Sequence, residues 1–233
     1  RELSEELARK RIPVKNLLDV MKNVLLPSKE VSADFFYYPK KGIGRLSGIL
    51  QDKIEEKGGE IHTNYFPESI NIEKNSIKII ASNNGKKEEF VADKVISTIP
   101  ITELPLLIKP TPPEKVINAS NKLKFRSLIV LYVIAEKEKI LKKDNCIFFP
   151  QKNFIFNRIS EMKSFRPHVI DPKKAVLMVE ITCDKNDHLW NSSDEEIFHL
   201  AIKDLEKARI IRRTEVTKCF TRKAAKVYPI YSL

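Results

Sequence analysis

Residues 34–50, DFFYYPKKGIGRLSGIL, constrain the fold of this chain more than any other segment. The segment places an aromatic run, a proline and a basic pair in front of three of the chain's six glycines. Apolar side chains then recur at helical spacing from Leu46 to Ile54. Gly58 and Gly59 predict the end of that helix, because glycine takes the left-handed conformation without strain. We therefore expect a glycine turn that leads directly into an amphipathic helix.

The three glycines, Gly42, Gly44 and Gly48, are spaced G-x-G-x-x-x-G, which is close to a dinucleotide-binding turn. Such a turn follows a buried strand, opens a helix and has an acidic residue about twenty positions later. Here the helix is in place and Glu60 stands where the acidic residue would lie, but Pro39 separates the glycines from a short aromatic run. We favour a joint between two domains over a phosphate-binding loop, and both interpretations stay open at this point.

The rest of the chain alternates between strand and helix patterns. Helices are predicted within residues 1–26, at residues 113–121, and after a capping box of Ser193 and Glu196. An Asn-Asn-Gly sequence at residues 83–85 predicts a hairpin turn. Strands are expected at residues 60–63, 69–73, 76–81, 87–91, 95–99, 125–135, 146–149, 154–159, 175–183 and 214–221. This order predicts an α+β fold, in which a mixed or antiparallel sheet backed by helices accompanies an α/β domain with a β-meander.

The net charge of +11 permits attraction to nucleic acid or to an anionic membrane surface. The lysines are spread along the chain and no basic run is interleaved with aromatic residues. We therefore expect no specific nucleic-acid partner, and at most a weak contact with an anionic membrane surface. No apolar run approaches about 18 residues, so no transmembrane segment is expected. Because the chain begins with Arg1 rather than Met, we expect it to be part of a longer protein.

The residue types that usually form metal or catalytic sites are scattered. Cys146, Cys183 and Cys219 are far apart and have neither metal nor redox spacing, which is typical of free thiols in a reducing, cytoplasmic compartment. The four histidines form no cluster at ligand spacing, so no metal site is predicted. No nucleophile elbow, phosphate-binding loop or carboxylate pair stands out, and no catalytic residue is assigned.

Two charged residues lie on segments that are otherwise apolar. Arg158 shares a predicted strand face with Phe154 and Phe156, and Glu180 lies on the predicted strand at residues 175–183. A charged group at a buried position needs a partner, so we hypothesise that Arg158 and Glu180 meet across a sheet. Such a pair is either a structural ion pair or a part of a substrate cavity.

Several short motifs occur in an order that resembles a known family. They are the aromatic–proline–glycine segment with its helix, Gly58-Gly59-Glu60-Ile61, the segment Ser97-Thr98-Ile99-Pro100, Leu123-Lys124-Phe125-Arg126-Ser127, Arg158-Ile159 and Tyr228-Pro229-Ile230-Tyr231. This order resembles the middle of FAD-dependent oxidoreductases of the amine oxidase/protoporphyrinogen oxidase superfamily, including relatives similar to UDP-galactopyranose mutase. The resemblance covers nearly the whole chain.

The resemblance implies a flavoprotein whose FAD domain is discontinuous. Residues 35–104 would belong to the FAD domain. Residues 1–34 and 105–233 would form the substrate domain, with the C-terminal end returning toward the FAD domain. The residues implied in cofactor binding are Gly42, Gly44, Pro67, Thr98 and Pro100, although Pro67 has no N–H to donate where the family holds the adenine through the backbone. A small-molecule substrate would be lined by Phe156, Arg158, Glu180 and Tyr228, with Arg158 binding an anionic group.

Two elements of the family are absent from these 233 residues. The strand–glycine loop–helix that carries the pyrophosphate would precede Arg1, and a segment that closes over the flavin would follow Leu233. We therefore expect this piece alone to bind FAD poorly and to be inactive. The complete protein is expected to take a hydride equivalent from a C–N or C–C bond. The alternatives are a non-catalytic binding module and a redox-neutral mutase that acts on a nucleotide sugar.

Overall fold

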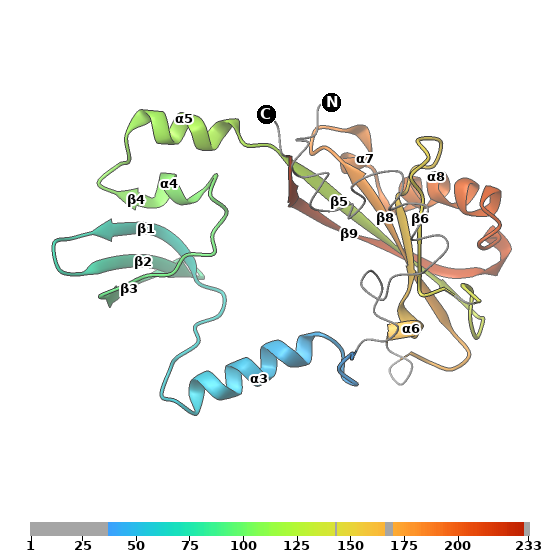
Figure 1. Ribbon diagram of the computed structural model, residues 1–233, viewed down its shortest axis with the longest axis horizontal. Coiled ribbons are helices and arrows are strands. Elements are labelled where there is room, and N and C mark those ends of the chain that lie inside the picture. The colour runs from blue at the N-terminus through green and yellow to red at the C-terminus, as the bar shows by residue number, and fades with distance from the viewer. Residues whose placement is uncertain (1–36, 143, 166–169, 231–233) are drawn as a thin grey trace, which may run out of the picture. The chain divides into compact units, whose positions relative to one another are not determined.

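A computed structural model describes residues 37–142, 144–165 and 170–230 (Figure 1). The helices expected within residues 1–26 lie outside the described residues. The chain divides into two compact units, which we call the meander unit (Ser47–Lys124) and the sheet unit (the described residues of Arg1–Leu46 and Phe125–Leu233). The assignment of residues 35–104 to an FAD domain, and of the rest to a substrate domain, stays a prediction.

The meander unit contains short strands and helices. They are most of α3 (Gly44–Glu55), then β1 (Phe66–Ile72), β2 (Ile77–Asn83), β3 (Lys86–Ala92), α4 (Leu104–Leu107), β4 (Ile108–Lys109) and α5 (Glu114–Lys122). The strand order is β3-β2-β1-β4, with β1, β2 and β3 antiparallel and β4 parallel to β1. Asn84 and Gly85 have φ values of 50° and 82°, which is the geometry of a tight hairpin turn. The predicted meander is therefore confirmed.

Two predicted strands of this unit are wrong. Residues 60–63 and 95–99 form no strand. A strand needs a neighbour for its backbone hydrogen bonds, and the edge of β1 is taken by β4 instead. Ile96 is 95% exposed, so the apolar run at residues 95–99 has no covering layer among the described residues.

The sheet unit is built on long antiparallel strands. Its elements are β5 (Phe125–Ala135), β6 (Cys146–Phe148), β7 (Arg158–Glu161), α6 (Met162–Phe165), β8 (Ala175–Cys183), α7 (His188–Asn191), α8 (Asp194–Lys207), the 3-10 turn η1 (Arg213–Glu215) and β9 (Val216–Pro229). The strand order is β6-β7-β8-β5-β9, and all neighbours are antiparallel. The two sheets with their helices confirm the predicted α+β fold class.

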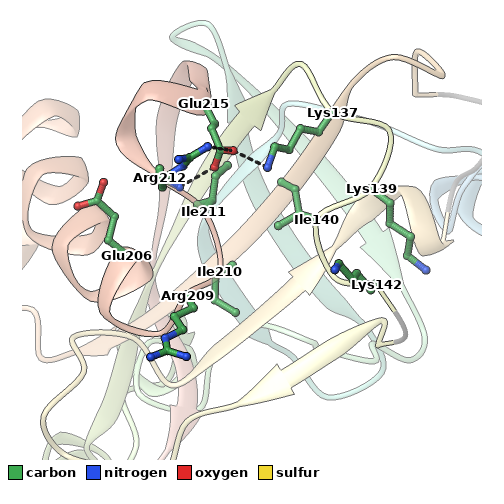
Figure 2. A pocket seen from close by; sticks show the side chains of 10 residues that line it. All are labelled: Lys137, Lys139, Ile140, Lys142, Glu206, Arg209, Ile210, Ile211, Arg212 and Glu215. Atoms are coloured by element: carbon green, nitrogen blue, oxygen red, sulfur yellow. Dashed lines mark hydrogen bonds and ion pairs between the residues drawn. The ribbon is translucent and has the colours of Figure 1, made fainter.

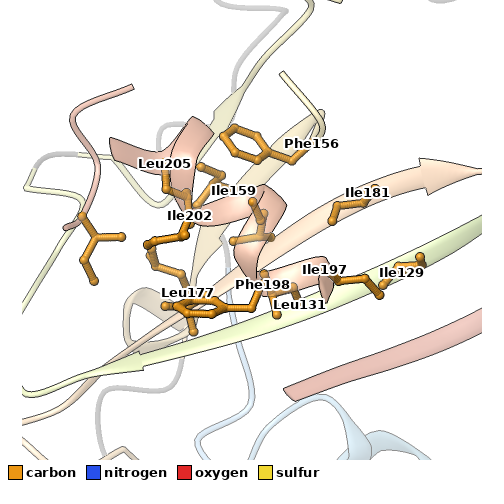
Figure 3. Close-up of a cluster of buried hydrophobic side chains, with 14 of the residues drawn as sticks. Ile129, Leu131, Phe156, Ile159, Leu177, Ile181, Ile197, Phe198, Ile202 and Leu205 are labelled. Carbon is orange, nitrogen blue, oxygen red and sulfur yellow. The ribbon is translucent and has the colours of Figure 1, made fainter. Parts of the chain in front are cut away.

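Helix α8 covers one face of this sheet. The predicted capping box begins it: the Ser193 hydroxyl accepts a hydrogen bond from the Glu196 N–H, and the Glu196 carboxylate accepts one from the Ser193 N–H. Buried side chains of α8 pack on buried side chains of the strands (Figure 3), chiefly Ile197, Phe198, Ile202 and Leu205 on Ile129, Leu131, Ile159, Leu177 and Ile181. Alternate residues of β5 and β8 point to this core, so their neighbours point to the opposite face.

The strand predicted at residues 154–159 is only partly correct, because β7 begins at Arg158. Before it, the Ile155 N–H donates to the Asp204 carboxylate on α8 at 2.8 Å. The rings of Phe149, Phe154 and Phe156 pack on one another at centroid distances of 4.9–5.6 Å. The aromatic side chains therefore join the core under α8, and the backbone enters the sheet only after them.

Candidate functional site

The face of the five-stranded sheet opposite α8 carries charged and aromatic side chains in rows, and we call it the Arg158 face. One row crosses all five strands, because Phe148 pairs with Arg158, Arg158 with Glu180, Glu180 with Val130, and Val130 with Arg222. Register partners lie on the same side of a sheet with their Cβ atoms about 5 Å apart. The row therefore places one arginine on each side of Glu180: Arg158 is its direct neighbour, and Arg222 follows beyond Val130.

Arg158 and Glu180 form the ion pair that the sequence predicts. The Arg158 guanidinium donates to the Glu180 Oε1 atom from Nε at 2.9 Å and also from Nη2. The Glu180 side chain is 5% exposed and the Arg158 side chain is 36% exposed. This hydrogen bond is the largest cause of the raised pKa of Arg158, and burial acts against it by lowering that pKa. Arg158 thus keeps its charge where part of the guanidinium reaches the surface.

Tyr228 and Cys146 lie within electrostatic range of Arg158. Each contributes to the raised pKa of Arg158, as the anionic form of a phenol or a thiol attracts a cation. Tyr228 is 48% exposed, and its register partner is Arg126. The ring of Phe148 lies 5.8 Å from the Arg158 guanidinium carbon. Three of the four residues predicted to bind substrate, Arg158, Glu180 and Tyr228, therefore gather on one face.

Phe156 does not share that face. It is 1% exposed and lies in the hydrophobic core. The prediction that Phe156 and Arg158 alternate along one strand is wrong, because the strand starts only at Arg158. Phe156 packs in the same core cluster as Ile159 of β7, and its side chain is not accessible to a ligand.

An aromatic pair lies in the next row of the Arg158 face. Tyr132 on β5 stacks on Phe220 of β9 with ring centroids 4.8 Å apart and planes 12° apart. The Arg222 guanidinium carbon lies 5.2 Å from the Phe220 ring, which is a cation–π distance. Sequence reasoning missed these three residues, because nothing short of the strand register brings residue 132 beside residue 220.

The glycine turn before α3 is a place where a cofactor can approach the backbone. Gly42 has a φ of 87°, and its N–H donates to the Pro39 carbonyl at 2.8 Å. A Cβ built on Gly44 would meet no heavy atom of the residues that the structure describes within 4 Å. Close packing against the described residues therefore does not explain Gly44, and the interpretation of this segment as a joint between two domains stays a prediction.

The described turn lacks the structure of a pyrophosphate cradle. A pyrophosphate cradle joins a strand to a helix through its glycines. Residues 37–43 form turns and no strand, so the described residues do not supply such a cradle here. What they supply is a backbone edge with room beside Gly44, which suits a close contact with another portion of the cofactor.

The three other predicted cofactor residues lie in the meander unit. Pro67 is on β1 beside a register shift and opposite Ala81. Thr98 is exposed, and the Pro100 carbonyl accepts hydrogen bonds from Glu103 and Leu104 at the start of α4. Their part in cofactor binding stays a prediction.

The described residues contain neither a metal-binding cluster nor a membrane-spanning helix. No group of three or more His, Cys, Asp or Glu side chains there is arranged to hold a metal ion. None of the helices in this part of the chain combines the length and the apolar character needed to cross a bilayer.

Comparisons with known proteins point to one family. The family of flavin containing amine oxidoreductases matches residues 13–227. No curated protein matches the chain. Among solved structures, reduced UDP-galactopyranose mutase is similar with a TM-score of 0.75 and 16% identity, over 97% of this chain and 48% of that one.

Two other solved structures share the fold. A candidate protoporphyrinogen oxidase from Exiguobacterium sp. 255-15 has a TM-score of 0.65 and 19% identity, over 83% of this chain and 41% of that one. Putrescine oxidase bound to putrescine has a TM-score of 0.59 and 13% identity, over 78% of this chain and 38% of that one. The chain thus spans less than half the length of these relatives. Since the family match extends over most of the sequence, the chain belongs to the family of flavin containing amine oxidoreductases.

Proposed function

We propose that this chain is the substrate-binding portion, together with part of the FAD-binding portion, of a flavin-dependent oxidoreductase. Membership of the flavin containing amine oxidoreductase family supports the reaction class. FAD, when bound to the complete protein, would accept a hydride equivalent from the substrate. The observation that carries the proposal is the Arg158–Glu180 pair, on a sheet face that the core helix leaves uncovered.

In this proposal Arg158 binds an anionic group of the substrate. Both of its hydrogen bonds to Glu180 go to the same oxygen, so Nε and Nη2 are engaged. The Nη1 edge has no hydrogen-bond acceptor among the described residues. Glu180 is a positioning residue: it holds the guanidinium in one orientation, and a cation held in place loses little freedom when it binds an anion.

The remaining residues would shape the cavity around that anchor. Tyr228 offers a phenol within electrostatic range of Arg158, and Arg222 adds a second cation in the same row. The Tyr132–Phe220 stack offers a flat apolar surface for the uncharged part of the substrate. Phe156 would act only from the core, by supporting β7.

The domain assignment is part of the proposal. Residues 1–34 and 105–233 would form the substrate domain. Residues 35–104 would contribute to the FAD domain, with Gly42, Gly44, Pro67, Thr98 and Pro100 near the cofactor. Residues 1–233 alone would be inactive, because the described glycine turn offers no pyrophosphate cradle.

Substrate turnover by the intact protein tests the role of Arg158. With an anionic substrate, the Arg158→Gln variant should raise KM roughly 10- to 100-fold while kcat changes little, since the lost bond is one to a charged group. Arg158→Lys should fall between the two proteins. The flavin absorption spectrum must stay unchanged in both variants, to separate loss of substrate binding from loss of cofactor. An unchanged KM in Arg158→Gln would remove Arg158 from the substrate site.

A redox-neutral reaction is the second candidate function. The observation that favours it is the similarity to UDP-galactopyranose mutase, which covers 97% of the chain, against 83% and 78% for the two oxidases. Assays of the intact protein with UDP-galactopyranose and with putrescine, each with and without oxygen, separate the candidates. Oxygen consumption supports an oxidase, rearrangement without net oxidation supports a mutase, and binding without turnover supports a non-catalytic module.

A further inference from the structure

A cavity of about 500 Å³ lies in the sheet unit between the loop that follows β5 and the segment that follows α8. Five basic side chains line it: Lys137, Lys139, Lys142, Arg209 and Arg212. Figure 2 shows the lysines on one wall and the arginines on the other, with Ile140 and Ile210 between them. We call this cavity the basic pocket.

The acidic residues of the basic pocket do not neutralise it. Only Glu206 and Glu215 line it beside the five cations, so three positive charges are in excess. Glu215 is engaged by Lys137 at 2.6 Å and by Arg212 at 3.3 Å. Glu206 accepts a hydrogen bond from the backbone N–H of Arg213 at 2.8 Å.

Three cations therefore remain available, namely Lys139, Lys142 and Arg209. None of them has an ion-pair partner among the residues that the structure describes. Cations that outnumber the anions of a cavity repel one another, and a bound anion reduces that repulsion. The negative end of the α8 dipole accounts for a cation at position 209 without any ligand. Lys139 and Lys142 belong to a different segment, so the dipole does not account for them.

Both walls of the pocket are held in place by the fold. On the lysine side, the buried Glu161 carboxylate accepts hydrogen bonds from the N–H groups of Ile140 at 3.0 Å and Leu141 at 2.7 Å. On the arginine side, Arg209 has a φ of 57°, and the following N–H of Ile210 donates to the Leu205 carbonyl at 2.9 Å. The cations are thus presented by anchored backbone, which lowers the entropy lost on binding.

The basic pocket is separate from the Arg158 row. That row meets β5 at Val130, whereas the pocket begins beyond the end of the strand at Ala135. The extended strand between them spans roughly 16 Å. A ligand in the pocket therefore does not compete with a substrate held by Arg158.

We propose that the basic pocket binds a small polyanion that carries phosphate groups. Arginine and lysine are the side chains that bind phosphate, Arg209 through its planar fork and the lysines as point charges. The volume of about 500 Å³ lies within the range of small-molecule sites and exceeds the need of a single inorganic anion. The phosphates can belong to a soluble molecule or to a lipid headgroup, and the experiment below separates these sources.

The test uses the intact protein with pyrophosphate as the soluble probe, in isothermal titration calorimetry at low salt. The pocket variant Lys139→Gln/Lys142→Gln/Arg209→Gln should bind pyrophosphate on the order of 100-fold more weakly. The matched control Lys152→Gln/Lys185→Gln/Lys203→Gln removes the same charge from exposed positions of the sheet unit outside the pocket. It should bind like the unmodified protein. All six side chains are exposed, so both variants should keep the thermal stability of the parent.

Sedimentation with phosphatidylcholine vesicles, with and without phosphatidic acid, forms the second arm. The proposal is supported if the pocket variant loses binding and the control variant does not. Such a loss with pyrophosphate indicates a soluble ligand, and such a loss with phosphatidic acid vesicles indicates a lipid headgroup. Equal losses in both variants would mean a general charge effect and would overturn it. The absence of binding to both probes would overturn it as well.

Discussion

Arg158 on β7 and Glu180 on β8 are direct register partners, and the arginine gives both of its hydrogen bonds to one carboxylate oxygen. The glutamate is almost fully buried, while the arginine remains partly exposed. The pair therefore combines a structural role for Glu180 with a surface that Arg158 can present to a ligand. Because of this difference in burial, we expect mutations of the two residues to change the free energy of unfolding and ligand binding to different extents.

Removing Arg158 should destabilise the protein, because it leaves the Glu180 carboxylate buried without a partner. We expect Arg158→Met to lower the free energy of unfolding by about 1–3 kcal/mol, and the exposure of Arg158 favours the lower end. The double variant Arg158→Met/Glu180→Met should recover part of this loss, since no charge is then left unpaired. Urea unfolding of the four proteins of the cycle gives the coupling energy. Additive losses would mean that the pair is not coupled.

Isolated residues 1–233 should be purified without flavin. Residues 37–43, the described part of the chain before α3, form turns and no strand, so they do not supply a phosphate cradle. In addition, α3 has no buried residue, and Leu50 on it is 63% exposed. A visible absorption spectrum should show no flavin band, and added FAD should not raise the Tm. A yellow preparation with stoichiometric flavin would contradict this prediction.

In the intact protein, Gly44→Ala should reduce the flavin content without lowering the stability of the flavin-free form. The added methyl group meets no atom of the described residues within 4 Å, so against this part of the chain it can interfere only with a ligand that occupies the space beside Gly44. Flavin absorbance per polypeptide, measured beside the Tm of the flavin-free protein, checks this. If the flavin content is unchanged, Gly44 does not contact the cofactor.

Glu215 should make the stability depend on pH in acid. The hydrogen bond from Lys137, with the backbone N–H of Arg212, lowers the pKa of Glu215 from 4.5 to about 2. Because the folded-state pKa lies below the unfolded value, this stabilisation is fully present above about pH 4.5 and is lost as the pH falls toward 2. In Glu215→Gln that part of the pH dependence should disappear.

Thermal unfolding of both proteins between pH 2 and pH 5 measures the difference. Glu195→Gln serves as a control, since Glu195 is an exposed residue of α8 whose side chain makes no hydrogen bond to the described residues. The difference in Tm between the parent and Glu215→Gln should shrink as the pH falls toward 2. A constant gap across this range would show that the Lys137–Glu215 contact does not act through the Glu215 charge.

Glu161 should be one of the most sensitive positions of the sheet unit. Its side chain is fully buried and accepts two backbone hydrogen bonds from the loop after β5. Glu161→Ala leaves both N–H groups without an acceptor and opens a cavity, so we expect a loss of about 2–4 kcal/mol. Glu161→Gln keeps one acceptor oxygen and should lose less. Amide hydrogen exchange at Ile140 and Leu141 should accelerate in both variants, and unchanged exchange would refute the anchoring role.

Local patterns were sufficient for much of the fold. The capping box of Ser193 and Glu196 predicts the start of α8, because its hydrogen bonds join residues three positions apart. The apolar, β-branched runs at residues 125–135 and 175–183 predict β5 and β8 with their observed bounds, because such residues favour strands. The Arg158–Glu180 pair follows from the cost of burying an unpaired charge on an apolar strand, although β7 begins only at Arg158.

Other features depended on partners far away in the chain. The run at residues 95–99 has the composition of a strand, but strand formation requires a neighbour, and β4 takes that place beside β1. Phe156 has the spacing of a strand residue, but packing with Phe149 and Phe154 draws it into the core.

The sequence by itself determined which family this chain resembles, which segments are long helices and strands, and that Arg158 and Glu180 need each other. The tertiary structure alone decided that Tyr132 stacks on Phe220 and that Lys139 faces the same cavity as Arg209. The physical reason is range. Propensity, capping and alternation act over a few residues, whereas strand register and loop anchoring join groups many positions apart, and no local pattern encodes that pairing.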